Sequence, residues 1–281
     1  MNSNVLYIDK PSGISSFDIC YKLRKVLNTK KIGHTGTLDP NATGVMIILY
    51  NQATKAAQFL VSDKKTYKAR VLLGVKTDTL DIDGKILENK AYKVPKKADI
   101  DYVLNSFIGK SKQVVPITSA KKINGKKLYE YQQKEQEVEL PVIDIEVFNI
   151  YLNEIYDDGF EFTCEVSAGT YVRALARDIL EKLGQIGTLS KLCRTCIDDI
   201  NLQECDELDD VLNGKYRNHN LLDVLSKRYK TYEVNNVDDI KNGKRIKIES
   251  DEEYLLLINN DEVLAMYQKD NDEYKSVRGL W

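Results

Sequence analysis

GHTGTLDP, residues 33–40, is the stretch of the sequence that is least like ordinary scaffold. Its two glycines allow backbone conformations that other residues resist, and Pro40 pushes the residue before it towards an extended conformation. That residue, Asp39, is the only carboxylate between Ile19 and Ser62, a span that also holds six basic residues. An isolated anion in a basic segment is either a simple turn residue before proline or a group with a chemical role.

The residues after the loop favour the chemical role. Residues 45–49 are a continuous apolar run (VMIIL), which is typical of a buried strand. Asp39 is therefore expected at the end of a strand, held by rigid scaffold, and such loop positions often carry catalytic groups. The turn interpretation explains why an aspartate stands before a proline, but it leaves the electrostatic isolation of Asp39 unexplained.

Arg173 is a second unusual residue. It falls in the first turn of a helix predicted over residues 170–183, where the helix dipole disfavours a cation by roughly 0.3–1 kcal/mol. Arg177, four residues on, is a like charge that can pair with Glu181 instead. Arg173 is therefore expected to take an anion from elsewhere in the fold, either a phosphate or a carboxylate such as that of Asp39.

Hydrophobic periodicity and turn residues predict a mixed α/β chain. Ser15 resembles the cap of a helix, with Phe17, Cys20, Leu23, Val26 and Leu27 as its apolar face. Strands are predicted at 4–9, 45–49, 66–73, 142–156 and 160–166, the last two joined by an Asp-Asp-Gly turn, and helices at 53–61, 98–108 and 170–183. Short strands after about residue 229 indicate a small β domain.

Composition bounds the class of protein. The chain has 281 residues, of which 42% are apolar and 30% charged, which is typical of a globular protein. No signal peptide or membrane span is evident. Five scattered cysteines fit a reducing compartment, so a cytoplasmic protein is expected. Cys193 and Cys196 form a lone CxxC, which is weak evidence for a metal or redox site.

The charge of the chain is segregated. The net charge is −2, but residues 1–134 hold 24 basic and 11 acidic residues, whereas the remainder holds 17 and 32. Such segregation indicates a polyanion that binds the first half, although lysines also serve as ordinary solubilising residues.

GHTGTLDPNATG, KKTYKA and GTYVRALARD together resemble the TruB-type tRNA pseudouridine synthases, which convert uridine 55 of the T-arm. DKPSGISSFD, LGVKTDTLDIDG and SAKKINGKKLYEY are similar to the same family, so the resemblance covers roughly residues 5–200. It implies an α+β pseudouridine synthase fold, with a mixed, largely antiparallel central sheet flanked by helices. It also implies a catalytic domain over 1–228, an RNA-binding insertion at about 110–140, and a small PUA-like β domain over 229–281.

The resemblance implies roles for individual residues. Asp39 matches the catalytic aspartate, and Arg173 matches the arginine paired with it. His34 matches a histidine that supports the extruded nucleotide. Tyr67 matches the tyrosine that stacks on the target uracil. Tyr171 and Leu192 match residues that line the uracil pocket. The sequence departs from the family pattern at Val115-Pro116, where paired prolines are usual, and at Cys193-Arg194, where an arginine pair is usual.

Isomerising uridine breaks the bond between base and ribose, turns the base and rejoins it through carbon, without redox change. No cofactor and no metal is therefore expected, and a carboxylate can serve as the nucleophile. Attack on uracil C6 and attack on ribose C1′ are both open at this stage. The target base has to swing out of the RNA stack into a pocket. The lysines expected to contact the RNA backbone are Lys64, Lys65, Lys68, Lys121, Lys122 and Lys126.

The expected partner is tRNA, through its T-arm stem-loop, and the protein is expected to act as a monomer without an obligate protein partner or a membrane. Two other classes of function are possible. A non-catalytic RNA-binding module or tRNA chaperone could use residues 33–36 as a GXXG loop, as in KH domains, but it would leave Asp39 and Arg173 idle. A hydrolase using Ser15 or Ser16 with His34 lacks a GxSxG-like elbow.

Overall fold

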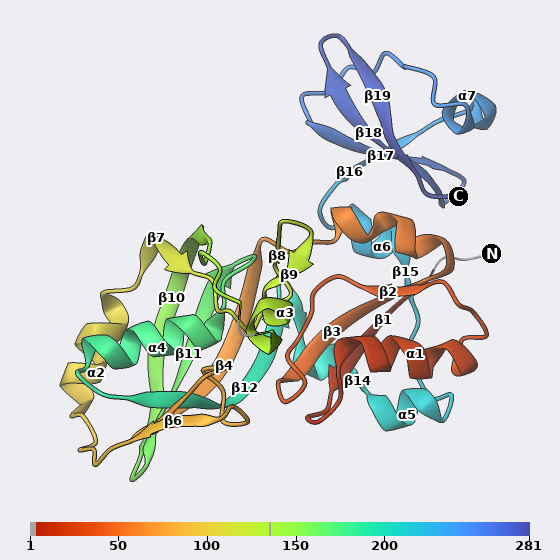
Figure 1. Cartoon of the computed structure of the whole chain (residues 1–281). Helices are drawn as coiled ribbons and strands as arrows, with labels where there is room; N and C mark the ends of the chain where they lie inside the picture. Colours follow the sequence, from red (N-terminus) through yellow and green to blue (C-terminus); the bar gives the residue numbers. More distant parts are fainter. Residues whose placement is uncertain (1–3, 135) are drawn as a thin grey trace. The chain divides into compact units, whose positions relative to one another are not determined.

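The structure is a computed structural model that describes residues 4–134 and 136–281. The chain forms two compact units: residues 1–40, 44–61 and 203–281 make unit 1, and residues 41–43 and 62–202 make unit 2. Each unit is built around its own β-strands (Figure 1).

The first part of unit 1 is a small sheet with helices packed on it. Its strands run in the order β14-β1-β3, with β2 paired to β3 and β15 to β1; only β1 and β14 are parallel. The elements are β1 (Asn4–Lys10), α1 (Ser16–Val26), β2 (Ile32–His34), β3 (Thr43–Tyr50), the 3-10 helices η1 (Asn51–Phe59) and η2 (Leu202–Glu204), β14 (Asp206–Glu207), α5 (Leu208–Leu212), β15 (His219–Asn220) and α6 (Leu221–Ser226).

The predicted strand after the loop is confirmed as β3, in which every residue from Gly44 to Tyr50 is buried or nearly so. α1 and α5 pack on β1 and β3 through a cluster that includes Leu6, Ile19 and Leu23. The apolar face predicted for α1 is wrong at Phe17, whose side chain is 67% exposed. Ser16 is buried in its place, because its hydroxyl bonds a distant part of the chain.

The C-terminal part of unit 1 is the predicted small β domain. Its sheet has the order β16-β17-β18-β19, and its core includes Leu255, Tyr267 and Tyr274. The elements are β16 (Lys230–Glu233), α7 (Val237–Lys241), β17 (Tyr254–Asn259), β18 (Glu262–Asp270) and β19 (Glu273–Gly279). The domain boundary at 228/229 stays a prediction.

Unit 2 contains an antiparallel sheet whose strands run in the order β12-β4-β11-β10-β7, with β13 paired to β12. The helices α2 and α4 pack on it (Figure 1). The elements are β4 (Lys64–Leu73), β5 (Val75–Thr77), β6 (Ile86–Asn89), α2 (Lys97–Asn105), β7 (Gly109–Val114), β8 (Lys122–Ile123), β9 (Lys126–Lys127), α3 (Leu128–Gln133), β10 (Val142–Tyr156), β11 (Gly159–Ser167), α4 (Val172–Lys182), β12 (Gly187–Ile197) and β13 (Ile200–Asn201).

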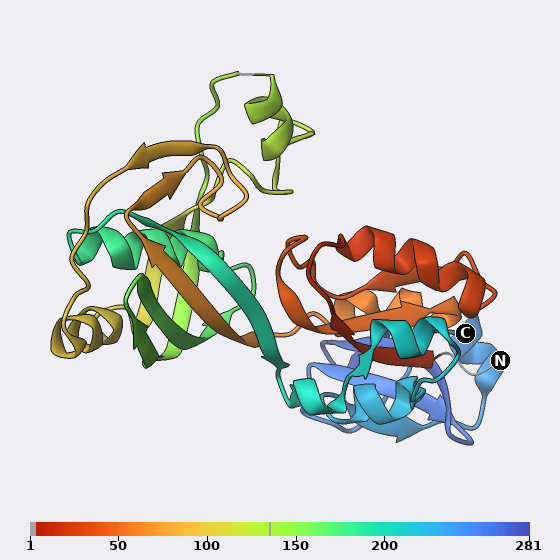
Figure 2. The same ribbon diagram turned by 90° about the horizontal axis from the view of Figure 1, so that it is seen from below.

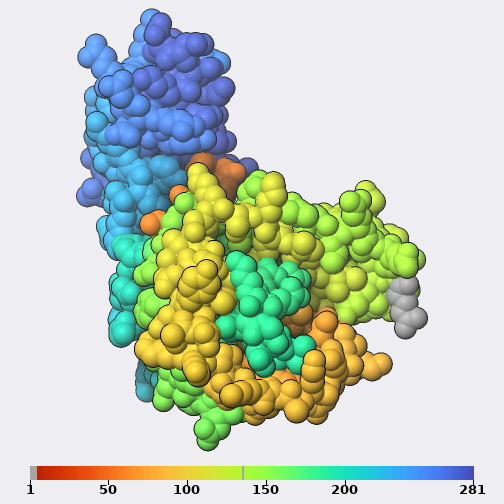
Figure 3. Space-filling model, turned by 90° about the vertical axis from the view of Figure 1, so that its left-hand side faces the viewer, coloured from red at the N-terminus to blue at the C-terminus, as the bar shows by residue number. Residues whose placement is uncertain are grey.

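The predicted insertion at 110–140 contains β8, β9 and α3. The chain turns between the two short strands at Asn124 and Gly125, both with positive φ, as a tight Asn-Gly hairpin requires. Figures 2 and 3 show this yellow-green segment projecting at the edge of unit 2. Within the described residues, no helix is long and apolar enough to cross a membrane.

We expect His219 to make the stability of unit 1 depend on pH. Its ring stacks on Tyr7 with centroids 4.0 Å apart. Burial lowers the pKa of His219, as do Arg217 and Lys227, against the opposing charges of Asp206 and Glu204. The neutral ring is therefore favoured in the folded state, whereas the unfolded chain takes up a proton near pH ~6.5.

Stability from this neutral ring is fully present above pH ~6.5 and is lost as the pH falls below it, at a rate of at most ~1.4 kcal/mol per pH unit. His219→Phe keeps an aromatic ring but removes the proton site. We expect the urea midpoint to fall less between pH 7.5 and 5.5 in this variant than in the wild type. Equal losses in both proteins would contradict the assignment.

Candidate active site

The loop that carries Asp39 connects β2 to β3. His34 is the last residue of β2 and pairs with Ile48, and the backbone N–H of Thr35 donates to the carbonyl of Ile47 over 3.2 Å. His34 and Asp39 are both half-buried. Residues 33–36 thus belong to a connection between two strands, β2 and β3. A KH loop should instead lead into a helix, so the KH interpretation is excluded.

Ser16 holds the residue before Asp39. The N–H of Leu38 donates to Ser16 Oγ over 3.0 Å, and the Ser16 hydroxyl donates to the carbonyl of Leu38 over 3.1 Å. Both side chains are buried. One hydroxyl at the start of α1 therefore satisfies both backbone groups of Leu38.

Lys10 holds the residue after Asp39. Its ammonium group, which has no exposed surface, donates to the carbonyls of Pro40 (2.7 Å) and Pro11 (2.9 Å). The N–H of Gly13 donates to the same Pro40 carbonyl over 2.9 Å. A buried ammonium group is costly unless it is hydrogen-bonded, and here the two proline carbonyls, one of them in the Asp39 loop, are the acceptors. Asp39 thus lies between two anchored neighbours.

The roles of Lys10 and Ser16 were missed by sequence reasoning. Both lie in DKPSGISSFD, which resembles the family, but nothing local shows that their side chains reach across some 20 to 30 residues. Their contacts only become visible in the tertiary structure.

In unit 2, the sheet places Tyr67 and Leu192 on neighbouring strands. Tyr67 is buried in β4 and lies opposite Arg194 of β12, while Leu192 lies opposite Ala69. Because side chains alternate along a strand, Tyr67, Arg194 and Leu192 share one face of the sheet. Arg194 is only 1% exposed. The sequence showed it merely as part of an altered arginine pair, so its buried position beside Tyr67 is a finding of the structure.

Tyr171 precedes α4 as its N-cap residue. The side chain of Gln113, buried in β7, accepts from the N–H of Tyr171 over 2.8 Å and donates to its carbonyl over 3.2 Å. Gln113 therefore fixes the start of α4, and no sequence signal pointed to it.

Arg173 is 7% exposed, in the first turn of α4. Its Nη1 donates to the carbonyl of Thr79 (2.9 Å) and to Thr118 Oγ1 (2.8 Å), and its Nη2 donates to the carbonyl of Thr118 (3.0 Å). The guanidinium group thus joins α4 to the loop after β5 and to the segment after β7. The predicted ion pair between Arg177 and Glu181 is wrong, because Arg177 pairs with Asp178 at 2.7 Å instead.

The six predicted backbone-contact lysines fall into different environments. Lys64 and Lys68 lie on the face of β4 opposite Tyr67, where Lys64 pairs with Glu165 (3.7 Å) and Lys68 with Glu161 (2.8 Å). The hydrogen bond and charge of Glu161 raise the pKa of Lys68. Lys65 is on the same face of β4 as Tyr67.

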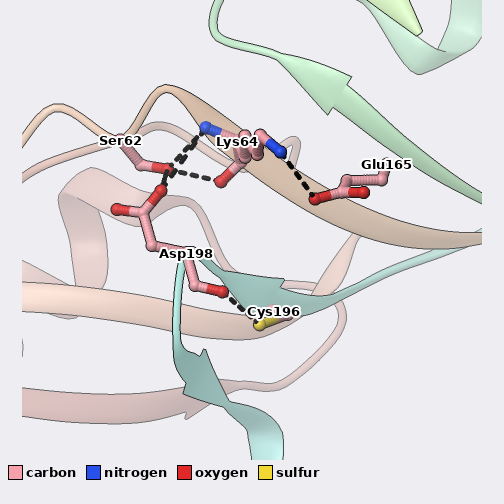
Figure 4. A network of polar contacts seen from close by, with 5 residues as sticks. All are labelled: Ser62, Lys64, Glu165, Cys196 and Asp198. Carbon is pink, nitrogen blue, oxygen red and sulfur yellow. Dashed lines mark hydrogen bonds and ion pairs between the residues drawn. The ribbon is translucent and has the colours of Figure 1, made fainter. Parts of the chain in front are cut away.

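A polar network ties the start of β4 to the end of β12 beside Lys64 (Figure 4). Ser62 Oγ lies 2.7 Å from Asp198 Oδ1, and the Lys64 N–H donates to Ser62 Oγ over 3.1 Å. Cys196 Sγ donates to the carbonyl of Asp198 over 3.1 Å. This network fixes the ends of the two strands that carry Tyr67 and Leu192.

The hairpin lysines Lys121, Lys122 and Lys126 are exposed. Lys126 lies over the ring of Tyr131, 5.9 Å from its centroid, and the Tyr131 hydroxyl donates to the carbonyl of Ile123 over 3.1 Å. In the part of the chain that the structure describes, none of the three lysines forms an ion pair with a carboxylate. They present positive charge beside an aromatic ring.

No group of three or more His, Cys, Asp or Glu side chains within residues 4–134 and 136–281 could hold a metal ion. Burial raises the pKa of Cys20 to about 11 and of Cys164 and Cys205 to about 12, so these thiols stay protonated and are poor ligands.

Known proteins are similar to this chain over most of its length. Residues 24–172 match the model of the TruB family pseudouridylate synthase N-terminal domain. A protein of Lactobacillus acidophilus named tRNA pseudouridine synthase B is 35% identical over 98% of this chain and 97% of its own length. The Bacillus subtilis protein of the same name is 46% identical over 75% of this chain and 70% of its own length.

A solved structure titled "Structure of H/ACA RNP bound to a substrate RNA containing 2'-deoxyuridine" superposes with a TM-score of 0.72 over 99% of this chain and 85% of that one, at 19% identity. That likeness shows that the two chains share a fold over nearly the whole length of this one. The chain belongs to the TruB family of pseudouridylate synthases.

Proposed function

We propose that this chain converts uridine 55 in the T-arm of tRNA into pseudouridine. The observation that carries the proposal is Asp39: it lies in the GHTGTLDPNATG motif, with both neighbouring residues anchored by buried side chains, in a chain similar over most of its length to proteins named tRNA pseudouridine synthase B.

Asp39 acts as the nucleophile. Its carboxylate forms a transient covalent bond to the substrate while the C1′–N1 bond breaks, and the base then turns so that C5 bonds to C1′. The C5 proton leaves to solvent and N1 gains a proton, so atoms balance without a cofactor or metal. Anchoring Leu38 and Pro40 holds the carboxylate in a reactive orientation, which lowers the entropic cost of the reaction.

The target base leaves the RNA stack and enters a pocket. Tyr67 stacks on the uracil, Tyr171 and Leu192 line the pocket, and His34 supports the extruded nucleotide. Arg173 pairs with Asp39 and favours its ionised form against the field of the RNA phosphates. The buried position of Tyr67 and the fixed guanidinium group of Arg173 support these roles.

The RNA backbone binds the exposed hairpin lysines Lys121, Lys122 and Lys126, with Lys65 on the Tyr67 face of β4. Lys64 and Lys68 contribute less than the sequence indicated, because binding a phosphate would require each to leave a carboxylate partner. The protein acts in the cytoplasm as a monomer without an obligate protein partner.

The test uses a tRNA transcript labelled with tritium at C5 of its uridines, because pseudouridine formation releases that hydrogen. The protein is expected to release one tritium from each wild-type transcript and no tritium from a transcript with cytidine at position 55. Release from the cytidine transcript would show a different target position, and no release from either would refute the activity.

A further inference from the structure

The end of α1 and the residues after it form an open pocket of about 900 Å³ in unit 1. Lys22, Arg24, Lys25 and Lys30 contribute to its lining, and no carboxylate does. Leu212 of α5 also lines it. The predicted site residues do not line this pocket.

Arg24 is the member of this pocket whose hydrogen bonding is incomplete. Its Nε is buried and has no hydrogen-bond partner within residues 4–134 and 136–281. Its guanidinium carbon lies 5.4 Å from the centroid of the Tyr21 ring. A buried donor without an acceptor is unfavourable, so a shift of the Arg24 side chain that turns its Nε towards an anionic ligand in the pocket would gain a charge-assisted hydrogen bond.

Two aromatic side chains extend the basic surface along α1. Phe17 is 67% exposed and Tyr21 is 62% exposed, and they lie four residues apart on the helix. Residues with this spacing are neighbours on a helix surface. Exposed aromatic rings beside cations suit nucleic acid, whose bases stack on the rings while its phosphates meet the cations.

The surface is separate from the Asp39 loop. Ser16, which holds Leu38, is the first residue of α1, whereas Lys25 lies nine residues later, or roughly 14 Å along the helix. We infer that the pocket and the exposed face of α1 bind a segment of tRNA outside the T-arm, through phosphates on Lys22, Arg24, Lys25 and Lys30 and through stacking on Tyr21. This inference rests on the proposed function, which assigns the T-arm to the Asp39 site.

The test compares the binding of full-length tRNA with that of an isolated T-arm stem-loop. In Lys22→Gln with Lys25→Gln, which changes two exposed side chains, the Kd for full-length tRNA is expected to rise roughly tenfold. The slope of log Kd against log salt should fall by about 2. Binding and conversion of the stem-loop should stay as in the wild type.

Two other lysine pairs serve as comparators. The double variant Lys121→Gln with Lys126→Gln, in the insertion hairpin, should weaken the binding of both RNAs. Lys93→Gln with Lys96→Gln, which has the same three-residue spacing on exposed residues, should change neither. Each variant is checked for an unchanged melting temperature.

Unchanged binding of full-length tRNA by the α1 variant would overturn the inference and leave the pocket to another class of ligand. An equal loss for both RNAs would also overturn it, because the surface would then contact the T-arm. Failure of the wild type to convert the stem-loop would instead count against the proposed function, so the two outcomes are distinguishable.

Discussion

Asp39→Asn is expected to release no measurable tritium from a tRNA that the wild-type enzyme converts completely. An amide has nearly the shape of a carboxylate but cannot act as the nucleophile, so turnover should fall by roughly 10⁴-fold or more. The hydrogen bonds from Ser16 and Lys10 to Leu38 and Pro40 use backbone groups of the loop, so the substitution keeps their donors and acceptors. The Kd for tRNA is therefore expected to stay within a few-fold of the wild-type value.

Asp63→Asn is the matched control. It makes the same chemical change at an exposed aspartate between η1 and β4, and turnover should be retained. If Asp39→Asn were as active as this control, Asp39 would not be the nucleophile. If it lost tRNA binding to the same extent as turnover, its role would be in binding and not in catalysis.

Local patterns predicted much of the fold. The hairpin β10–β11 is confirmed to within a residue at each strand boundary, because alternation and an Asp-Asp-Gly turn are encoded in adjacent residues. The helix predicted over 170–183 is confirmed as α4, and the buried run at 45–49 as the middle of β3. Membership of the family was predicted from short motifs and is confirmed by comparison over most of the chain.

The errors and omissions concern long-range contacts. Phe17 was assigned to the buried face of α1 because it is apolar, but Ser16 is buried there because it bonds Leu38, 22 residues away. Lys10 and Gln113 would both be expected at the surface by residue type, and both are buried because distant backbone groups satisfy them. A single sequence does not show which distant groups will meet.

Arg173→Ala is expected to reduce turnover by about 100-fold or more and to destabilise the protein. The loss of the guanidinium group removes three hydrogen bonds to partly buried acceptors: the carbonyls of Thr79 and Thr118, and Thr118 Oγ1. A hydrogen bond to a charged group contributes about 1.5–3 kcal/mol, so the structural effect alone is substantial. The alanine variant therefore does not separate the structural role of Arg173 from its proposed electrostatic role.

Two other variants, Thr118→Val and Arg173→Lys, separate the structural role of Arg173 from its proposed electrostatic role. Thr118→Val removes one hydroxyl partner of Arg173 and keeps the charge, so it should lower stability with little effect on turnover per folded molecule. Arg173→Lys keeps the charge but not the two-pronged geometry, and should retain more turnover than alanine.

The pH dependence of turnover decides between the two roles. If Arg173 stabilises the ionised nucleophile, the acid limb of the kcat profile should move to higher pH in Arg173→Ala, because an anion without its cation is protonated more easily. It should stay in place in Thr118→Val, since that variant keeps the guanidinium group. A structural role alone would lower the whole profile of Arg173→Ala without moving its limbs, and that result would remove the proposed pairing of Arg173 with Asp39 while leaving Asp39 as the nucleophile.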